Sequence, residues 1–358
     1  MEASLKVYFE ILTSQKYKVT LDSIIFGLQK FGGISNYWLN LINLLDDEFS
    51  KNLILPKGFS QNFSSSIHHK IEFIPHQISR YLPVKNFNQE DIFHSSYYRL
   101  PLNEKSKYVV TVYDFTYEKY TRGAIRRIHT IQKSKSFDRA DAIICISENT
   151  KNDLLKYYPK ISQEKLFVTH LGINDEIYFN NEPICNYDNY EVLFIGNRHS
   201  YKRFDLIVDA LELNKEFTLG IVGPELNKAE REILNNKIPL RWKEYGFVDQ
   251  DSLRKLYQRA FCFIFPSDYE GFGLPLIESM SCGCPVVASD RSCFREIAGD
   301  AASYADSQDP EVYLQKILEL QDLETRSKLI QKGLKRSKEF SWQKTIDRTK
   351  DIYLRILD

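Results

Sequence analysis

The chain has 358 residues, of which 43% are hydrophobic and 27% are charged, an ordinary balance for a globular protein. Its 48 basic and 48 acidic residues cancel, which argues against a nucleic-acid-binding protein that relies on an overall positive field. The length exceeds what one compact core usually holds, so we expect two domains.

The six cysteines include no C-x-x-C pair, and several of them lie in apolar runs. We therefore expect buried thiols in a reducing compartment. No apolar run approaches the length of a transmembrane helix. Glu2, Lys6 and Glu10 interrupt the segment in which a signal peptide would need an apolar core, so a cytoplasmic enzyme is the expectation.

The first half of the chain alternates short apolar runs with helical patterns. Residues 1–16 form an extension before the first expected strand, at 17–25. Further strands are expected at 53–55, 71–74, 92–95, 108–113, 142–146 and 167–169, and helices at about 122–139 and 148–157. This alternation predicts a doubly wound α/β domain over residues 1–173, in which ligands bind beyond the carboxyl ends of the strands.

Three features of this half are candidates for a site. Gly32 and Gly33 precede a helical pattern, although many turns look the same. His94, Tyr113 and Asp114 lie at the carboxyl ends of two expected strands. His94 could equally be a histidine that bonds the backbone, and Asp114 could equally turn or cap the loop that follows it.

A polar stretch at 174–189 lacks periodicity, which predicts a linker to a second domain at 190–340. In that domain we expect strands at 190–195, 217–222, 261–265 and 285–288, and helices at about 225–237, 252–260 and 274–280. Helices at 309–320, 323–339 and 341–357 end the chain. The chain has no G-x-G-x-x-G motif, which argues against a dinucleotide-dependent oxidoreductase.

Two polar motifs flank helices of the second domain. Arg198 and Lys202 follow the first strand and a glycine, a plausible anion site, although surface cations are common enough that the pattern alone does not predict one. Asp249 and Asp251 form the only D-x-D triplet of the chain. They directly precede a helical pattern, so we favour helix capping over a metal site and predict no bound metal.

The stretch 260–290 predicts a strand, a glycine loop, a helix and a second strand, which together make a βαβ unit. The backbone amides of Gly273 and Leu274 lie at the start of the helix, where the dipole favours a phosphate. Glu270 precedes this start, and Glu278 could accept hydrogen bonds from two neighbouring ribose hydroxyls. Either glutamate alone could be an ordinary surface acid; their combination with the glycines predicts a site.

The residues from Glu270 to Glu278, in the order Glu-Gly-Phe-Gly-Leu-Pro-Leu-Ile-Glu, closely resemble the group 1 family of retaining nucleotide-sugar glycosyltransferases. The resemblance is strong from 190 to 305 and weaker before residue 90. It implies the GT-B fold, with two Rossmann-like domains that face a central cleft and a last helix, 341–358, that crosses back to the first domain. It also implies transfer of a sugar from a UDP- or GDP-linked donor to a saccharide or lipid-linked saccharide, without a cofactor, in bacterial surface polysaccharide synthesis.

The resemblance also implies roles for individual residues. Arg198 and Lys202 would neutralise the donor diphosphate, Glu270 would face the donor sugar, and Glu278 would hold the ribose. The remaining donor contacts would be Gly32, Gly33, Phe247, Val248, Gly271, Phe272, Gly273 and Leu274. Relatives often have His-Asp where this chain has Tyr113 and Asp114, so the acceptor-side contact expected there stays open.

Three other functions share these features. A non-hydrolysing UDP-sugar epimerase has the same fold, and a nucleotide-sugar-binding protein could bind the donor without turnover. A glucan synthase is a third alternative, for which the chain is short.

A local excess of positive charge lies between residues 119 and 139. Its members are Lys119, Arg122, Arg126, Arg127, Lys133, Lys135 and Arg139. Ile125, Ile128 and Ile131 recur there at a spacing of three, so one helix can carry an apolar stripe and a basic face. We favour a helix whose isoleucines pack on the sheet of the first domain; the alternative is peripheral contact with an anionic membrane.

Overall fold

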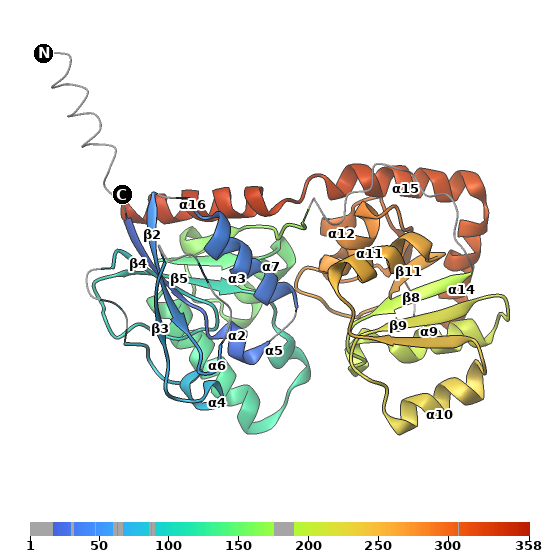
Figure 1. The fold of residues 1–358 in the computed structure, drawn as a ribbon, viewed down its shortest axis with the longest axis horizontal. Helices are drawn as coiled ribbons and strands as arrows, with labels where there is room; N and C mark the ends of the chain where they lie inside the picture. The colour runs from blue at the N-terminus through green and yellow to red at the C-terminus, as the bar shows by residue number, and fades with distance from the viewer. Residues whose placement is uncertain are drawn as a thin grey trace, which may run out of the picture. The chain divides into compact units, whose positions relative to one another are not determined.

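The computed structural model describes residues 17–29, 32–46, 48–59, 63, 67–85, 87, 90–174, 190–306 and 308–358. The expected N-terminal extension and all but the first residue of the expected linker lie outside these ranges. The chain divides into two compact units, the first made of residues 1–170 and 342–358 and the second of residues 171–341 (Figure 1).

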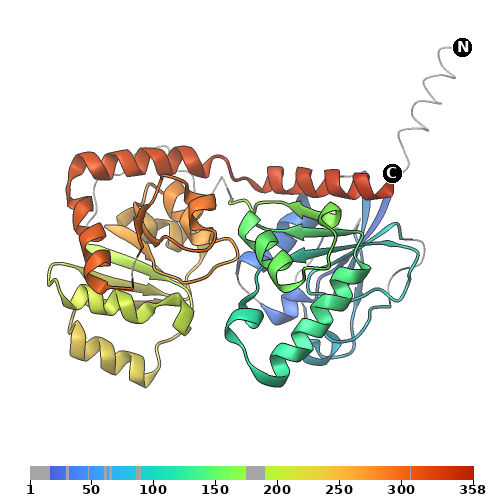
Figure 2. The same ribbon diagram turned by 180° about the vertical axis from the view of Figure 1, so that it is seen from behind.

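The first unit is built on a seven-stranded sheet with the order β3-β2-β1-β4-β5-β6-β7, parallel throughout. The strands are β1 (Tyr17–Asp22), β2 (Phe49–Leu55), β3 (His68–Ile71), β4 (Ile92–Ser95), β5 (Lys107–Val112), β6 (Ala142–Cys145) and β7 (Leu166–Val168). The helices are α2 (Ile25–Leu28), α3 (Gly33–Leu44), α4 (His76–Ser79), α5 (Thr116–Tyr120), α6 (Gly123–Arg139), α7 (Glu148–Tyr157) and α16 (Trp342–Leu357). Helix α3 lies in front of the sheet in Figure 1 and α6 in front of it in Figure 2, so helices cover both faces. Strands covered in this way must be apolar on both sides, which explains the near-continuous apolar runs of β4 to β6.

The second unit is built on a six-stranded parallel sheet with the order β10-β9-β8-β11-β12-β13. The strands are β8 (Glu191–Ile195), β9 (Thr218–Val222), β10 (Trp242–Gly246), β11 (Cys262–Phe265), β12 (Val286–Ser289) and β13 (Ser303–Ala305). The helices are α9 (Phe204–Glu212), α10 (Lys228–Lys237), α11 (Gln250–Arg259), α12 (Leu274–Ser281), α13 (Phe294–Ala298), α14 (Pro310–Leu318) and α15 (Leu323–Ser337). The order reverses between β8 and β11, the switch point at which ligands bind in open α/β sheets.

Both sheets confirm the predicted Rossmann-like α/β class, and the sequence misjudged several element ends. Ile25 begins α2 rather than ending the first strand, and its N–H donates to Ser96 Oγ at 3.2 Å. Strand β10, which was not predicted, ends at Gly246, whose φ of 69° is left-handed. The strand expected at 71–74 is β3, which ends at Ile71. The short elements β13, α4 and α5 were not predicted.

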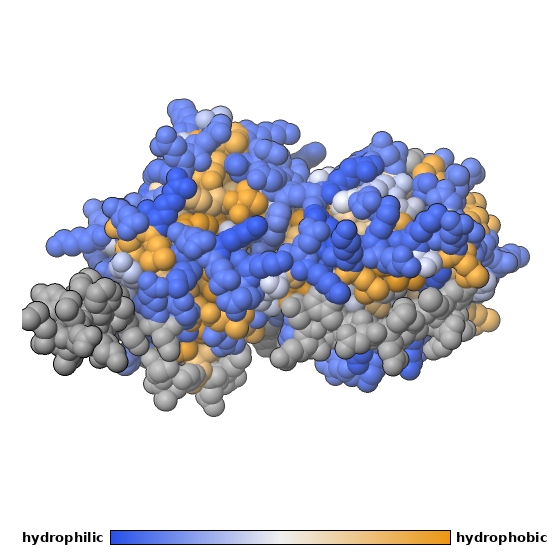
Figure 3. Space-filling view, turned by 90° about the horizontal axis from the view of Figure 1, so that it is seen from above, coloured by the Kyte–Doolittle hydropathy of each residue, from blue (hydrophilic) through white to orange (hydrophobic). Residues whose placement is uncertain are grey.

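Helix α16 packs on the first unit with an amphipathic pattern. Its buried face includes Trp342, Ile346, Ile352 and Tyr353, and Thr345 Oγ1 donates to the carbonyl of His170 at 2.8 Å. The surface seen from the side of α15 and α16 is mainly hydrophilic, with smaller apolar patches (Figure 3). No helix in the described part of the chain is both long and apolar enough to cross a membrane. The five cysteines of the described ranges are buried thiols, as predicted.

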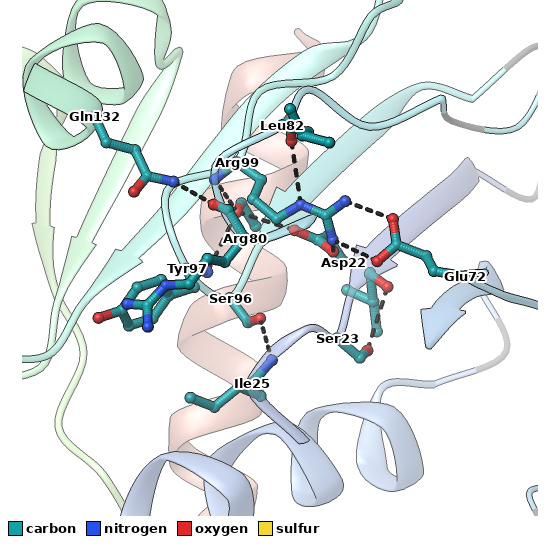
Figure 4. Close-up of polar contacts among 12 residues, drawn as sticks. Asp22, Ser23, Ile25, Glu72, Arg80, Leu82, Ser96, Tyr97, Arg99 and Gln132 are labelled. Carbon is teal, nitrogen blue, oxygen red and sulfur yellow. Dashed lines mark hydrogen bonds and ion pairs between the residues drawn. The ribbon is translucent and has the colours of Figure 1, made fainter. Parts of the chain in front are cut away.

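A buried charge cluster ties together the loops at the carboxyl end of the first sheet (Figure 4). Arg99 Nη1 donates to Asp22 Oδ1 at 2.9 Å, and Arg99 Nη2 donates to Glu72 Oε1 at 2.5 Å. Arg99 Nε also donates to the carbonyl of Leu82 at 3.4 Å. Burial raises the pKa of Asp22 to about 6, against the opposing charge of Arg99. The cluster therefore depends on all three charges being present.

Replacing Arg99 with alanine is expected to lower the free energy of unfolding by about 3–5 kcal/mol, because it leaves the Asp22 carboxylate buried without its cation. Urea unfolding at neutral pH measures the loss. Arg254→Ala, which breaks a pair with the largely exposed Asp251, is the control and should cost less than about 1 kcal/mol. A loss from Arg99→Ala no larger than that of the control contradicts the assignment.

Candidate functional site

Helix α12 begins at the carboxyl edge of the second sheet, directly after the loop that follows β11. Its N-cap is Gly273, with φ 87° and ψ 52°. A side chain there would be strained by this left-handed backbone, and its Cβ would lie 3.3 Å from Leu276 Cδ1. The glycine therefore lets the chain turn sharply into the helix, whose first amides carry the positive end of the dipole.

Lys202 and Glu270 form an ion pair beside this helix start, although they are far apart in the sequence. The side chains are only 12% and 15% exposed, so the pair is shielded from solvent. A backbone hydrogen bond of 2.7 Å from Asp268 to Tyr201 joins the two loops. Ser292 Oγ accepts from the N–H of Glu270 at 3.1 Å and donates to its carbonyl at 2.7 Å, which holds the Glu270 backbone in place. Nothing in the sequence pointed to Ser292.

Arg198 lies after β8, and its side chain is 6% exposed. Its Nε donates to Glu230 Oε1 and its Nη2 to the carbonyl of Glu225, both at 2.8 Å. Its Nη1 is buried and has no hydrogen-bond partner among the described residues. Although partial burial acts to raise it, the hydrogen bond from Arg198 holds the pKa of Glu230 below its ordinary value. A shielded guanidinium with one N–H group that has no hydrogen-bond acceptor suits an anionic ligand.

Gly223 also shapes this edge of the sheet, and the sequence analysis did not identify it. The carbonyl oxygen of Gly196 lies only 2.5 Å from where a Cβ on Gly223 would stand, so the loops after β8 and β9 meet backbone to backbone. The φ of Gly223 is 140°. The signal that could have identified it is the Gly-Pro pair directly after an apolar strand.

Glu278 lies in the second turn of the short helix α12 and is partly buried. Its Oε2 accepts from the hydroxyl of Tyr257 at 3.2 Å, and Tyr257 is fully buried on α11. The same hydroxyl lies 3.4 Å from the carbonyl of Pro275. Tyr257 therefore orients the carboxylate, a contact that the sequence did not reveal.

The aromatic residues assigned to the donor differ from one another. Phe272 is 3% exposed and its ring packs against Phe340 at 6.0 Å, so the ring belongs to the core and the predicted donor contact of this residue stays a prediction. Phe247 is 74% exposed and Val248 is half-buried, both beyond the edge strand β10. Gly271 lies in the loop between Glu270 and Phe272, and Leu274 opens α12.

Gly32 and Gly33 lie in the first unit, at the start of α3. Gly32 is the N-cap of the helix, with φ 146°, and Gly33 is its first residue. A Cβ on Gly32 would lie 2.5 Å from the side chain of Gln29. Their contact with donor phosphates stays a prediction.

The first unit contains a cavity of about 230 Å³ at the carboxyl end of its own sheet. Its polar lining comprises Gln29, Arg80, Tyr97, Tyr98, Tyr113, Asp114, Tyr117 and Lys133. The Arg80 guanidinium lies 4.5 Å from the centre of the Tyr97 ring, and Gln132 Nε2 donates to the Arg80 carbonyl at 2.5 Å (Figure 4). Burial raises the pKa values of Tyr97, Tyr98 and Tyr113, so these hydroxyls stay protonated at neutral pH. A cavity lined by hydroxyls and aromatic rings suits a polar ligand such as a sugar.

The three acceptor-side candidates have different environments. His94 is fully buried, and its ring nitrogens hydrogen-bond the Tyr353 hydroxyl at 2.5 Å and Thr111 Oγ1 at 2.8 Å. Burial lowers the pKa of His94 to about 3, so the ring is neutral, and its prediction as an acceptor contact is wrong. Tyr113 and Asp114 do line the cavity.

Both cavity-lining candidates also make local hydrogen bonds. The Tyr113 hydroxyl accepts from Trp38 Nε1 at 2.5 Å. Asp114 Oδ1 accepts from the N–H of Thr116 at 2.9 Å, so Asp114 also turns its loop, as the alternative held.

The D-x-D triplet caps a helix, as predicted. The Asp249 side chain accepts from the N–H of Ser252 at 2.7 Å, and Asp251 pairs with Arg254 and Lys255. No group of three or more His, Cys, Asp or Glu side chains in the described ranges is arranged to hold a metal ion.

Comparison with known proteins places these observations in a family. The model "Glycosyl transferases group 1" matches residues 178–336, and the model "Glycosyltransferase Family 4" matches residues 56–177. O-antigen chain mannosyltransferase B of Escherichia coli is 28% identical over 286 residues, which cover 73% of this chain and 74% of that protein.

Two solved structures share the fold. Sucrose-phosphate synthase from Thermosynechococcus elongatus has a TM-score of 0.75 at 17% identity, over 95% of this chain and 98% of that one. HepE of Anabaena, solved in complex with UDP and glucose, has a TM-score of 0.72 at 14% identity, over 94% and 98%. The matched models and the two parallel-sheet units agree: the chain belongs to the group 1 glycosyltransferases with the GT-B fold.

Proposed function

We propose that the protein transfers a sugar from a nucleoside diphosphate donor to a hydroxyl of a saccharide acceptor, with retention of the anomeric configuration. The observation that carries this proposal is the group of charges at the switch point of the second sheet. Lys202 and Glu270 are paired beside the start of α12, and Arg198 has a buried guanidinium nitrogen without a partner in the described chain. These groups suit a diphosphate and the sugar that it carries.

The charges would act mainly on the leaving group. Negative charge grows on the diphosphate as the bond to the sugar breaks, and fixed cations in a shielded place stabilise it without reorganisation. Lys202 would exchange its contact with Glu270 for the phosphate and leave Glu270 to face the sugar. Glu278 would accept hydrogen bonds from the ribose hydroxyls, in the orientation that Tyr257 sets.

Retention follows if the acceptor attacks from the face that the diphosphate leaves. The bond from the anomeric carbon to the phosphate oxygen breaks, and a bond to the acceptor oxygen forms on the same face. The acceptor proton passes to the departing phosphate oxygen. This route needs no covalent intermediate on the protein, and we assign none of its residues as a nucleophile.

The acceptor would bind in the cavity of the first unit, where Tyr113 and Asp114 are lining residues. The similarity to an O-antigen chain mannosyltransferase supports a role in bacterial surface polysaccharide synthesis. The donor would be a UDP- or GDP-linked sugar, and the UDP complex of a protein with the same fold supports the first. The acceptor would be a saccharide, free or attached to a lipid carrier.

Turnover is expected to persist after exhaustive chelation, because Lys202, Arg198 and the helix dipole can neutralise the leaving diphosphate. The measurement is the initial rate of nucleotide release with and without EDTA. A complete loss that Mg²⁺ or Mn²⁺ restores would show that a metal supplies this charge instead.

Product analysis tests the function itself. The protein is incubated with UDP- and GDP-sugars, with and without a saccharide acceptor, and the products are examined by NMR. Acceptor-dependent nucleotide release with the donor's anomeric configuration in the product is the expected result. An isomerised nucleotide sugar without acceptor identifies an epimerase, and binding without any product identifies a catalytically silent protein.

A further inference from the structure

Helix α6 buries mainly polar side chains and exposes its isoleucines, the reverse of the usual amphipathic helix. Its buried residues are His129, Lys133, Ser136 and Phe137, three of them polar. Ile125, Ile128 and Ile131 are 58%, 50% and 55% exposed. The prediction that these isoleucines pack on the sheet is therefore wrong, and the apolar stripe faces outward.

Buried polar contacts fix this orientation. Lys133 Nζ pairs with Glu118 Oε2 and donates to the carbonyl of Asp114, both at 3.0 Å, and both members of the ion pair are about 2% exposed. The hydroxyls of Ser136 and Tyr108 are hydrogen-bonded at 2.6 Å. Turning the isoleucines inward would expose or unpair these groups, which is strongly unfavourable for the buried ion pair. The outward stripe is thus a property of the folded unit.

Cations surround the exposed isoleucines. Arg122, Arg126, Arg127 and Lys135 are exposed, and none of them makes an ion pair within the described ranges. The other three basic residues of the segment are paired, Lys119 with Asp153, Lys133 with Glu118 and Arg139 with Asp141. Since the whole chain is neutral, the positive charge of these four residues is a local feature.

The neighbouring segment 73–81, which contains α4, carries further exposed apolar side chains. Phe73 is 91% exposed, Ile78 57% and Tyr81 45%. The segment touches α6 directly, because Arg80 Nη2 lies 3.3 Å from His129 Nε2 and the rings of Tyr81 and His129 are 6.4 Å apart. Exposed apolar side chains are therefore also present on the element that adjoins α6.

We propose that α6 docks on an anionic lipid bilayer through the isoleucine–arginine surface, made of Arg122, Ile125, Arg126, Arg127, Ile128, Ile131 and Lys135. Isoleucines interspersed with arginines suit the boundary between anionic headgroups and acyl chains, where both kinds of side chain gain. A second copy is a poorer occupant, because a two-fold interface would place this surface, with its unpaired cations, against itself. Charge complementarity thus selects the bilayer.

The surface lies on α6, an element that also lines the acceptor cavity. Arg80 follows α4, Tyr117 lies on α5 and Lys133 lies on α6, and all three line the cavity. Docking would therefore bring the cavity close to the membrane, where a lipid-linked saccharide presents its sugar. This step rests on the proposed function, whereas the binding of lipid itself does not.

The test is co-sedimentation of the full chain with vesicles of phosphatidylcholine alone or mixed with phosphatidylglycerol, at low and high salt. One variant carries Ile125→Ser, Ile128→Ser and Ile131→Ser, and a second carries Arg126→Gln and Arg127→Gln. Two control variants change exposed residues elsewhere in the chain. The first carries Leu213→Ser, Leu240→Ser and Leu323→Ser, and the second carries Lys105→Gln and Lys215→Gln.

Wild type should sediment with the mixed vesicles at low salt and dissociate at high salt. Each test variant should lower the partition coefficient by about tenfold or more, and the controls should leave it unchanged. Sedimentation with neither vesicle, equal sedimentation with both, or no change in the test variants overturns the proposal. A concentration-dependent dimer that the isoleucine variant abolishes would assign the surface to a second copy instead.

Calorimetric titration with nucleoside diphosphates separates this proposal from the proposed function. The isoleucine variant should bind the nucleotide as the wild type does, since none of the changed residues lies in the second unit. Vesicle binding without nucleotide binding by the wild type contradicts the proposed function alone. Nucleotide binding without vesicle binding contradicts the docking alone.

Discussion

Replacing Lys202 with alanine is expected to lower kcat by about 10²–10³-fold, the usual loss when a fixed group that stabilises transition-state charge is removed. The KM for the donor should rise much less, because the charge of Lys202 matters most as the diphosphate leaves. Steady-state kinetics with a saturating acceptor measures both constants. The ammonium of Lys202 is held beside the helix start by its ion pair with Glu270.

Two further variants serve as controls for Lys202→Ala. Lys202→Arg keeps the positive charge and should retain more activity than the alanine variant. Lys215→Ala removes an exposed lysine of the same unit and should leave kcat unchanged. Arg198→Ala should act in the same direction as Lys202→Ala, but it also unpairs Glu230, so its stability must be measured too. A change in KM alone would show that Lys202 only binds the ground-state phosphate.

Replacing Glu278 with alanine is expected to weaken the binding of the donor and of the free nucleoside diphosphate by the same factor, because the ribose is common to both. Losing hydrogen bonds to a charged group costs about 1.5–3 kcal/mol, which corresponds to roughly a ten- to hundredfold rise in Kd. Calorimetric titration with each ligand measures the change.

Two further variants separate a binding role of Glu278 from a structural one. Tyr257→Phe removes only the hydroxyl that orients the carboxylate, so it should weaken both ligands in parallel and by less. Glu232→Ala removes an exposed acid of α10 and should leave both affinities unchanged. An unchanged affinity in Glu278→Ala, with the fold intact by circular dichroism, would exclude the ribose contact.

The sequence predicted the local structure around α12 well, because the signals there are local. The buried run of β11, the positive-φ glycine at 273 and the proline in the first turn of α12 lie within about a dozen residues, and each restricts the backbone by itself. The roles proposed for Lys202 and Glu270 come from the family resemblance. Their ion pair could not be predicted from local patterns, because it depends on how two loops of one sheet edge meet.

Predictions failed where a distant residue decides the environment. The strand-end position of His94 suggested an open site, but Tyr353 of the last helix closes over its ring. The isoleucine spacing of α6 located the apolar stripe without showing which side of the helix faces the core. The buried pair of Lys133 with Glu118 decides that side, and charged residues are expected inside only when they are paired.

Calorimetric titration of the wild type with UDP, GDP and ADP, their sugar conjugates and the free nucleosides tests the central claim most directly. We expect one diphosphate and its sugar conjugate to bind at a single site, and the corresponding nucleoside to bind far more weakly. That difference would arise from Lys202, Arg198 and the start of α12, which act only on the phosphates. Binding of none of these ligands, or equal affinity for a nucleoside and its diphosphate, would contradict a donor site at this place.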